Sequence, residues 1–332
     1  MKKIISVILL ACMVFTLAAC GETAATYTLG MGVELSTASS KTANAQVDAT
    51  VAAVVLDANG KIVACRLDSA QSKMDVTDGA VDTAAVFQTK MEKGEAYGMV
   101  AYGNAIAEWD AQAKAFEEYV VGKTGAEVAA METVVNDSGH TVTTDETLYA
   151  SCTMSIADFI AAVVKACADT RSATFTTAGT FTLGLAAITD ASESTAATEA
   201  ENGVVKMYTE FGAAVVGADG KILAAATDAT QPKITIDTAG EIVEAAFNGT
   251  KMELGSDYGM VAYGNAVAEW CDQAKAFTDY VVGKTSAEVR AIETVTNEEG
   301  HSVSTDETLL ATCTMSISGM MAVVAQAADY AR

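Results

Sequence analysis

The chain contains one segment twice, and this repeat constrains its fold more than any other feature. Residues 95–124 and 256–285 are identical at 23 of 30 positions. The spacing between the copies is 161 residues at Trp109 and Trp270, and it keeps that value to the end of each copy. A duplication of this kind predicts two domains of one fold, and 332 residues suffice for two domains of roughly 100 to 200 residues each.

The copies begin near residues 26 and 180, where Thr-Tyr-Thr-Leu-Gly faces Thr-Phe-Thr-Leu-Gly. After an N-terminal segment over 1–20, we therefore predict a first repeat domain over 21–171 and a second over 172–332. The middle block diverged least. Three explanations for its retention stay open: a shared ligand site, a shared interface between the copies, or a densely packed helix.

Turn signals predict an α+β fold in each copy. Residues 51–56 and 62–67 are typical of two strands joined by an Asn-Gly turn, and residues 217–220 repeat that turn. We expect two homologous lobes, each with a β-hairpin in an antiparallel sheet that packs against helices.

Apolar residues at spacings of three and four predict the main helix of each copy. In the first copy it is expected to begin at Asn104 as N-cap, to carry Ile106 and Trp109 on its buried face, and to end at Gly122. A closing helix follows from residue 156 onward. Three pairs are spaced as capping boxes: Thr124 with Glu127, Thr285 with Glu288, and Ser155 with Asp158.

The N-terminus resembles the signal peptide of bacterial lipoproteins. Lys2 and Lys3 precede an apolar stretch over 4–16, and Leu-Ala-Ala then leads to Cys20, as in a lipobox. The resemblance implies that the Cys20 sulfur is lipidated and that the mature protein is anchored to the cell membrane on its extracytoplasmic face. No later segment is long and apolar enough to be expected to cross a bilayer.

The charge of the expected mature part excludes some partners. It has 18 basic and 43 acidic residues, a formal charge of −25. Such a surface repels phosphate backbones, so we expect no nucleic-acid partner. Contact with the membrane is expected through the lipid anchor rather than through surface charge.

An eight-residue motif, Tyr-Gly-Met-Val-Ala-Tyr-Gly-Asn, stands at 97–104 and recurs unchanged at 258–265. Its glycines permit close approach of backbone to a ligand, and its tyrosines could flank a planar ring. The alternative is a structured loop whose aromatic side chains pack on the helix of Trp109. The tryptophans themselves are expected in the core.

The end of each copy resembles the FMN-binding domain family of exported lipoproteins and membrane redox subunits. That family has a Gly-Lys-Ile hairpin turn, matched at 60–62 and 220–222. Before a closing helix it has Ser-Gly-Ala-Thr-x-Ser, whose threonine takes FMN through a phosphoester. Here 150–155 read Ala-Ser-Cys-Thr-Met-Ser and 311–316 read Ala-Thr-Cys-Thr-Met-Ser. Covalent FMN, noncovalent flavin and a related fold without flavin stay open as alternatives.

The resemblance implies a surface lipoprotein that carries electrons outside the membrane, with membrane redox proteins as partners. We expect a carrier rather than a turnover enzyme. No serine or cysteine nucleophile with a nearby acid can be assembled from the sequence, and this lack of a catalytic constellation favours an alternative outside redox chemistry. The alternative is a non-redox lipoprotein that binds a ligand or has a structural role at the surface. The expected FMN-binding residues are Thr153, Ser155, Thr314, Ser316, Tyr97, Tyr102, Tyr258 and Tyr263.

Overall fold

The computed structural model describes residues 23–332 except 170, 172 and 265. The expected lipidation site Cys20 and the last residue of the second tyrosine motif, Asn265, lie outside the described residues. The expected α+β class is confirmed, because antiparallel sheets pack against helices in both copies. In the described part of the chain, no helix has the length and apolar character needed to span a membrane.

The first copy builds a meander in which the predicted hairpin is confirmed and extends further than expected. Its sheet has the order β3-β2-β1-β6. The last strand comes after the expected domain boundary and pairs with β1, so the sheet crosses from one repeat into the next. The bounds are Ala25–Ser36 for β1, Asn44–Leu56 for β2, Ile62–Asp75 for β3 and Ala173–Thr177 for β6.

The second copy repeats the meander with the order β10-β9-β7. Both hairpins turn at a glycine with positive φ, 73° at Gly60 and 78° at Gly220, as the Asn-Gly and Asp-Gly sequences predict. The bounds are Phe181–Asp190 for β7, Tyr208–Gly217 for β9 and Ile222–Thr230 for β10.

Helices and a two-stranded ribbon follow each hairpin in the same order. In the first lobe these are α1 Lys90–Lys93, η1 Gly94–Tyr97, α2 Met99–Gly103, α3 Trp109–Val120, α4 Gly125–Ala129, β4 Thr133–Val135, β5 Thr141–Thr143, α5 Glu146–Tyr149 and α6 Ala157–Ala168. In the second they are α7 Lys251–Leu254, η2 Gly255–Tyr258, α8 Met260–Gly264, α9 Trp270–Tyr280, α10 Ser286–Arg290, β13 Thr294–Thr296, β14 Ser302–Ser304, α11 Glu307–Leu310 and α12 Ser318–Asp329.

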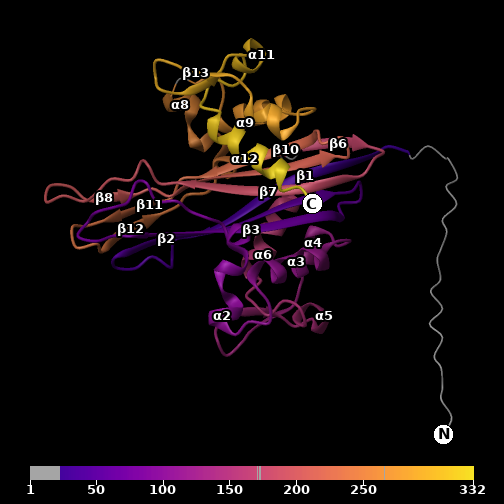
Figure 1. Cartoon of the computed structure of the whole chain (residues 1–332), viewed down its shortest axis with the longest axis horizontal. Coiled ribbons are helices and arrows are strands. Elements are labelled where there is room, and N and C mark those ends of the chain that lie inside the picture. The colour runs from indigo at the N-terminus through magenta and orange to yellow at the C-terminus, as the bar shows by residue number, and fades with distance from the viewer. Residues whose placement is uncertain (1–22, 170, 172, 265) are drawn as a thin grey trace, which may run out of the picture.

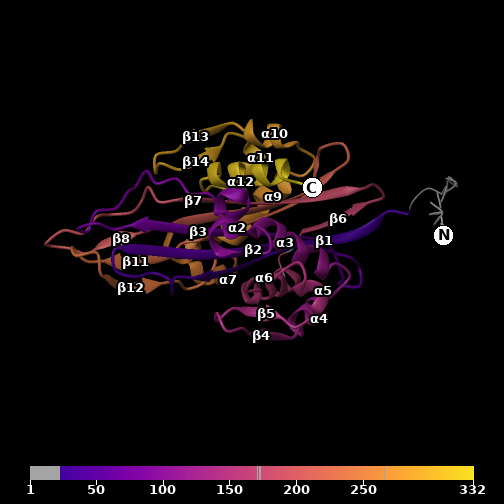
Figure 2. The ribbon, with the colours of Figure 1, turned by 60° about the horizontal axis from the view of Figure 1, so that its bottom comes forward.

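The two lobes pack sheet against sheet, which gives four layers (Figure 1). The helices of the first lobe cover one outer face and those of the second lobe cover the other, as the turned view also shows (Figure 2). Between the sheets lies one apolar cluster drawn from both copies. Its fully buried members include Leu29, Val51, Val55, Leu183 and Phe211. Each lobe also has a buried cluster of its own between its sheet and its helices, so the shared cluster is a third core that joins the two repeats.

A third sheet extends one end of the sandwich. It has the order β12-β11-β8, with bounds Gly203–Val205 for β8, Lys233–Ile236 for β11 and Ile242–Ala246 for β12. It shares a buried cluster with the far ends of β2 and β3, including Val47, Met74 and Ile234. The two copies differ most in this region. The first copy extends β2 and β3 into it, whereas the second copy adds the separate short strands β8, β11 and β12.

The main helix begins later than its apolar spacing predicts. Helix α3 starts at Trp109, and Asn104 instead ends α2 with φ of 50°. Ile106 lies before the helix and is 55% exposed, so its expected place on the buried face is wrong. Glu108 accounts for the difference, because its carboxylate accepts the backbone N–H groups of Met99 and Val100 and holds the preceding segment as a separate turn.

Some of the predictions of helix ends are confirmed and one is wrong. Both Thr–Glu boxes before α4 and α10 are confirmed, as is the helix stop at Gly122, which has φ of 84°. The box expected for Ser155 with Asp158 is wrong. Ile156 occupies the N-cap position of α6 and no side chain caps it. Its own N–H donates to Thr141 of the ribbon.

Each closing helix lies so close to its sheet that only glycine fits at the crossing. A Cβ at Gly30 would overlap the backbone oxygen of Ala166 in α6, and one at Gly184 would overlap that of Ala327 in α12. Both glycines occupy equivalent places in β1 and β7. The contact fixes each helix against its own sheet.

We expect Gly30→Ala to lower the free energy of unfolding by about 1 to 3 kcal/mol, because the overpacked backbone has to separate. Urea unfolding followed by circular dichroism measures the change. Gly103→Ala is the matched control, since nothing lies within 4 Å of a Cβ at Gly103. Equal stability of the two variants would contradict the close helix–sheet contact.

Candidate functional site

The turn that carries Thr153 is held by a buried glutamine of the main helix. Gln112 is fully buried, and its side-chain oxygen accepts the Thr153 N–H at 2.9 Å. The Thr153 hydroxyl lies 3.4 Å from the same oxygen. The glutamine amide donates to the Ala107 carbonyl at 2.7 Å. One side chain thus joins the segment before α3 to the turn before α6.

The second lobe repeats this arrangement with equivalent residues. Gln273 accepts the N–H groups of Thr314 at 2.8 Å and Met315 at 3.2 Å. Its amide donates to Ala268 at 2.8 Å. Together with Trp109 and Trp270, whose predicted burial is confirmed, these contacts give the retained middle block a packing role.

The residues that depart from the family motif leave the threonine accessible. Ser151 stands where the family has glycine, and its hydroxyl turns back to donate to the Leu148 carbonyl at 3.3 Å. Thr312 does the same toward Leu309 at 3.2 Å. Cys152 points into the core of the lobe and is fully buried. None of these side chains covers the following threonine.

The four expected hydroxyl residues differ in exposure. Thr153 and Thr314 are half-buried, whereas Ser155 and Ser316 are exposed. The Ser316 hydroxyl accepts the N–H of Ser302, so it also ties the turn to the ribbon. The threonine hydroxyls lie one turn before a twelve-residue helix in each lobe.

The expected tyrosines separate into an inner and an outer pair. Tyr97 and Tyr258 are half-buried, with their hydroxyls 3.4 Å and 2.9 Å from glutamine side chains of β3 and its counterpart segment. Lys90 lies 5.2 Å from the Tyr97 ring centre and 5.6 Å from that of Trp109. Lys251 takes the same position over Tyr258 and Trp270.

The outer pair, Tyr102 and Tyr263, is 90% exposed. Each ring lies over the preceding glycine of its motif, Gly98 or Gly259, where a Cβ would overlap it. The main clefts of the described residues are lined neither by the outer tyrosines nor by Thr153 or Thr314.

A carboxylate lies beside the first turn of each closing helix, but the two lobes supply it from different elements. In the first lobe it is Asp158 of α6. In the second lobe the equivalent residue is Gly319, and Glu210 of β9 extends its carboxylate to the space above that glycine. Burial raises the pKa of both carboxyl groups. Each helix N-terminus is thus already next to an acidic group.

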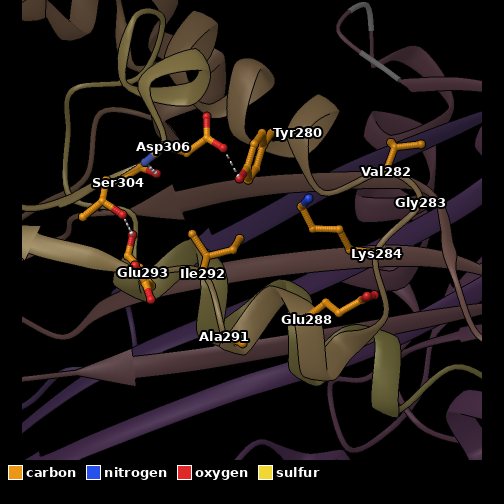
Figure 3. Close-up of a pocket in the computed structure, with 11 residues that line it drawn as sticks. Tyr280, Val282, Gly283, Lys284, Glu288, Ala291, Ile292, Glu293, Ser304 and Asp306 are labelled. Atoms are coloured by element: carbon orange, nitrogen blue, oxygen red, sulfur yellow. Dashed lines mark hydrogen bonds between the residues drawn. The ribbon is translucent and has the colours of Figure 1, made fainter.

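A wide cleft lies elsewhere in the second lobe, between the end of α9 and the ribbon (Figure 3). It has a volume of about 540 Å³. Tyr280 donates to Asp306 at 2.9 Å, and the Lys284 ammonium lies 4.3 Å from the Tyr280 ring centre. Hydrogen bonds from the Leu309 N–H and the Tyr280 hydroxyl lower the pKa of Asp306.

The first lobe has an equivalent cleft of about 310 Å³. There Tyr119 donates to Asp145 at 2.8 Å, and Lys123 lies 4.3 Å from the Tyr119 ring centre. None of the expected site residues lines either cleft. Sequence reasoning missed these groups, although their identity in the two copies was a signal that could have found them.

Comparison with known proteins gives one partial likeness. No protein-family model matches the chain. No solved structure matches it. Over 93 residues it is 36% identical to a protein named chlorophenol reductase from Desulfitobacterium hafniense, a match that covers 24% of this chain. The chain spans about 28% of the length of that relative.

A buried aspartate stands at the same place in each lobe, close to the lysine over the inner tyrosine. Asp68 accepts the N–H groups of Ser69 and Met91, and Asp228 accepts those of Ala229 and Met252. Burial is the main cause that raises the pKa of Asp68 to about 6 and that of Asp228 to about 7. The unfolded value is near 3.8.

Because the folded pKa is raised, these groups stabilise the fold at low pH, and that contribution is lost as pH rises to 6 and 7. From pH 4 to pH 6 for Asp68, and from pH 4 to pH 7 for Asp228, we expect the free energy of unfolding to fall by about 1.4 kcal/mol per pH unit and group. Urea unfolding at pH 4.5, 6 and 7.5 measures the slope.

The Asp68→Asn, Asp228→Asn double variant keeps the acceptor oxygens and cannot titrate, so its slope over this range should be shallower. A slope equal to that of the wild type would mean that these aspartates titrate normally in the fold.

Proposed function

We propose that this protein is an exported lipoprotein, anchored through Cys20 to the extracytoplasmic face of the cell membrane, that carries electrons on FMN. Each lobe holds one FMN through its threonine, Thr153 or Thr314. Membrane redox proteins are its proposed partners. The observation that carries the proposal is the duplicated turn, in which a buried glutamine presents the threonine before the closing helix.

One further finding supports flavin attachment, and another supports redox chemistry in general. The side chains that replace the family's glycine and alanine turn away from Thr153, so its hydroxyl is not covered by them. The partial relative is named a reductase, and reductases transfer electrons. The exposed Tyr102 and Tyr263 then serve as contact surfaces for a redox partner rather than as walls of the flavin site.

The neighbouring carboxylates decide which form of FMN fits. A free FMN phosphate has a charge of about −1.5 to −2 at neutral pH. Asp158 in one lobe and Glu210 in the other would repel that charge at the helix N-terminus. A phosphodiester on the threonine hydroxyl has a single charge, so the residues present fit a covalent ester better than a dissociable ligand.

When bound, FMN supplies one- and two-electron transfer. The role of the protein chain is to hold the FMN in place. Gln112 and Gln273 fix the backbone of the two turns, which keeps the threonine hydroxyls in one position relative to the helices. In each lobe the inner tyrosine, with its lysine over the ring, packs against the buried cluster between the sheet and the helices.

The test is an absorption spectrum of the full-length protein from its own host, recorded before and after denaturation and removal of small molecules. Flavin bands that survive denaturation are expected. Thr153→Ala and Thr314→Ala should each remove about half of the bound flavin, and the double variant should remove all of it, because each lobe has one ester.

The matched controls are Ser151→Ala and Thr312→Ala, which change a hydroxyl in the same turns and should leave the flavin content unchanged. A colourless wild-type protein, or flavin that persists in the double threonine variant, would contradict the proposed attachment.

The duplicated Tyr–Asp–Lys cleft favours a second candidate, a non-redox surface lipoprotein that binds a small ligand. Tyr280, Asp306 and Lys284 converge on a cleft that none of the flavin residues enters. Loss of ligand binding in Tyr280→Phe or Lys284→Ala, in a protein without flavin, would favour this function over electron transfer.

A further inference from the structure

The two lobes meet at two equivalent junctions. Charged side chains fill the first of them, and a pocket remains at the second. At the first, the edge strand β3 faces β7; at the second, the edge strand β10 faces β1. The internal repeat relates them, so each residue at one junction has a counterpart at the other. Comparing the pairs shows which groups the second junction lacks.

An ionic cluster fills the first junction. Glu117 of α3 is 2% exposed, and its carboxylate accepts the Leu67 N–H at 2.8 Å from the edge of β3. The guanidinium groups of Arg66 and Arg332 lie 3.5 Å and 3.3 Å from the same carboxylate. A carboxylate held by an edge N–H and two guanidinium groups completes this junction.

At the second junction the carboxylate is missing. Thr278 replaces Glu117, Ala226 replaces Arg66, and Thr227 replaces Leu67. Arg171 is the counterpart of Arg332 and remains. Thr227 pairs with Gly212 in the register that Leu67 has with Ala52, so its N–H also points outward from the strand edge.

A pocket occupies the place that Glu117 takes in the first lobe. It has a volume of about 40 Å³ and is lined by Arg171, Thr227 and Thr278 among others. A groove of about 360 Å³ shares five of its lining residues, Arg171 among them. Met31 and Met252 line both the pocket and the groove and provide apolar walls. The lining therefore combines the Arg171 cation and a strand-edge N–H with apolar walls, and further charged side chains complete it.

The acidic residues of this pocket are already engaged. Asp169 accepts the N–H groups of Met31 and Arg171. Glu253 pairs with Lys165 at 2.9 Å. Asp228 accepts two backbone N–H groups, as described above. The guanidinium of Arg171 donates to the Met252 carbonyl at 3.0 Å, which holds it at the pocket wall.

We propose that this pocket between the lobes binds a small organic carboxylate, whose carboxyl group takes the position that Glu117 fills in the first lobe. Arg171 and the Thr227 N–H bind the carboxylate oxygens, as Arg332 and the Leu67 N–H bind those of Glu117. A short apolar tail lies against Met31 and Met252. This site is independent of the flavin turns, because it has no residue in common with them.

Propionate is the probe, and saturation-transfer NMR of its methyl signal on the full-length protein in detergent measures binding. Saturable binding is expected for the wild type. The Ala226→Arg, Thr278→Glu variant, which copies the first junction into the second, should bind at least tenfold more weakly because an internal carboxylate fills the pocket. Arg171→Gln should weaken binding to a similar extent without filling it.

The reverse variant, Arg66→Ala with Glu117→Thr, opens the first junction and should gain a second propionate site. Its thermal midpoint should rise with propionate more than that of the wild type does. Wild-type protein without saturable binding, or undiminished binding in both Arg171→Gln and the filled variant, would overturn the proposal.

Discussion

The packing of one sheet on the other is the interaction on which the rest of this structure depends. Each copy places an apolar face of its sheet inward, and a single lobe would leave that face in water. Leu29, Val51 and Val55 of the first copy are buried by Leu183 and Phe211 of the second. Burial of apolar surface contributes roughly 25 cal/mol for each Å² removed from water. The net free energy of unfolding of a domain is only about 5 to 15 kcal/mol, so leaving a whole sheet face in water would cost a large part of it. The duplication thus supplies the partner that a single copy lacks.

The same packing gives the two copies different local environments, although their local structures agree. The glutamine contacts to Thr153 and Thr314, the Thr–Glu capping boxes and the lysines above the inner tyrosines recur in both lobes. At the junctions the symmetry is broken, because Glu117 has Thr278 as its counterpart. A duplicated fold can keep one pair of equivalent sites while one junction is filled and the other stays open.

The candidate sites show why local patterns identify some groups and not others. The threonine turns could be found because the motif is continuous in sequence. The cleft of Tyr280 and Asp306 could not be assembled from spacing, since a helix end and a turn 26 residues later meet there only in the fold. Glu210 shows the same limit more sharply. It replaces the carboxylate of Asp158 from another element, and aligned positions alone would report only an aspartate lost to glycine.

The sequence by itself determined the elements whose causes are local. The Asn-Gly and Asp-Gly turns, the two Thr–Glu capping boxes and the buried tryptophans follow from backbone preferences and apolar spacing, which act within a few residues. The start of the main helix did not follow, because the Glu108 carboxylate binds backbone groups eight and nine residues earlier. Only the tertiary structure decided that the two sheets pack on each other in a shared cluster and that their two junctions differ. Contacts between sheets depend on residues more than a hundred positions apart, and no periodic pattern in the chain records which faces will meet.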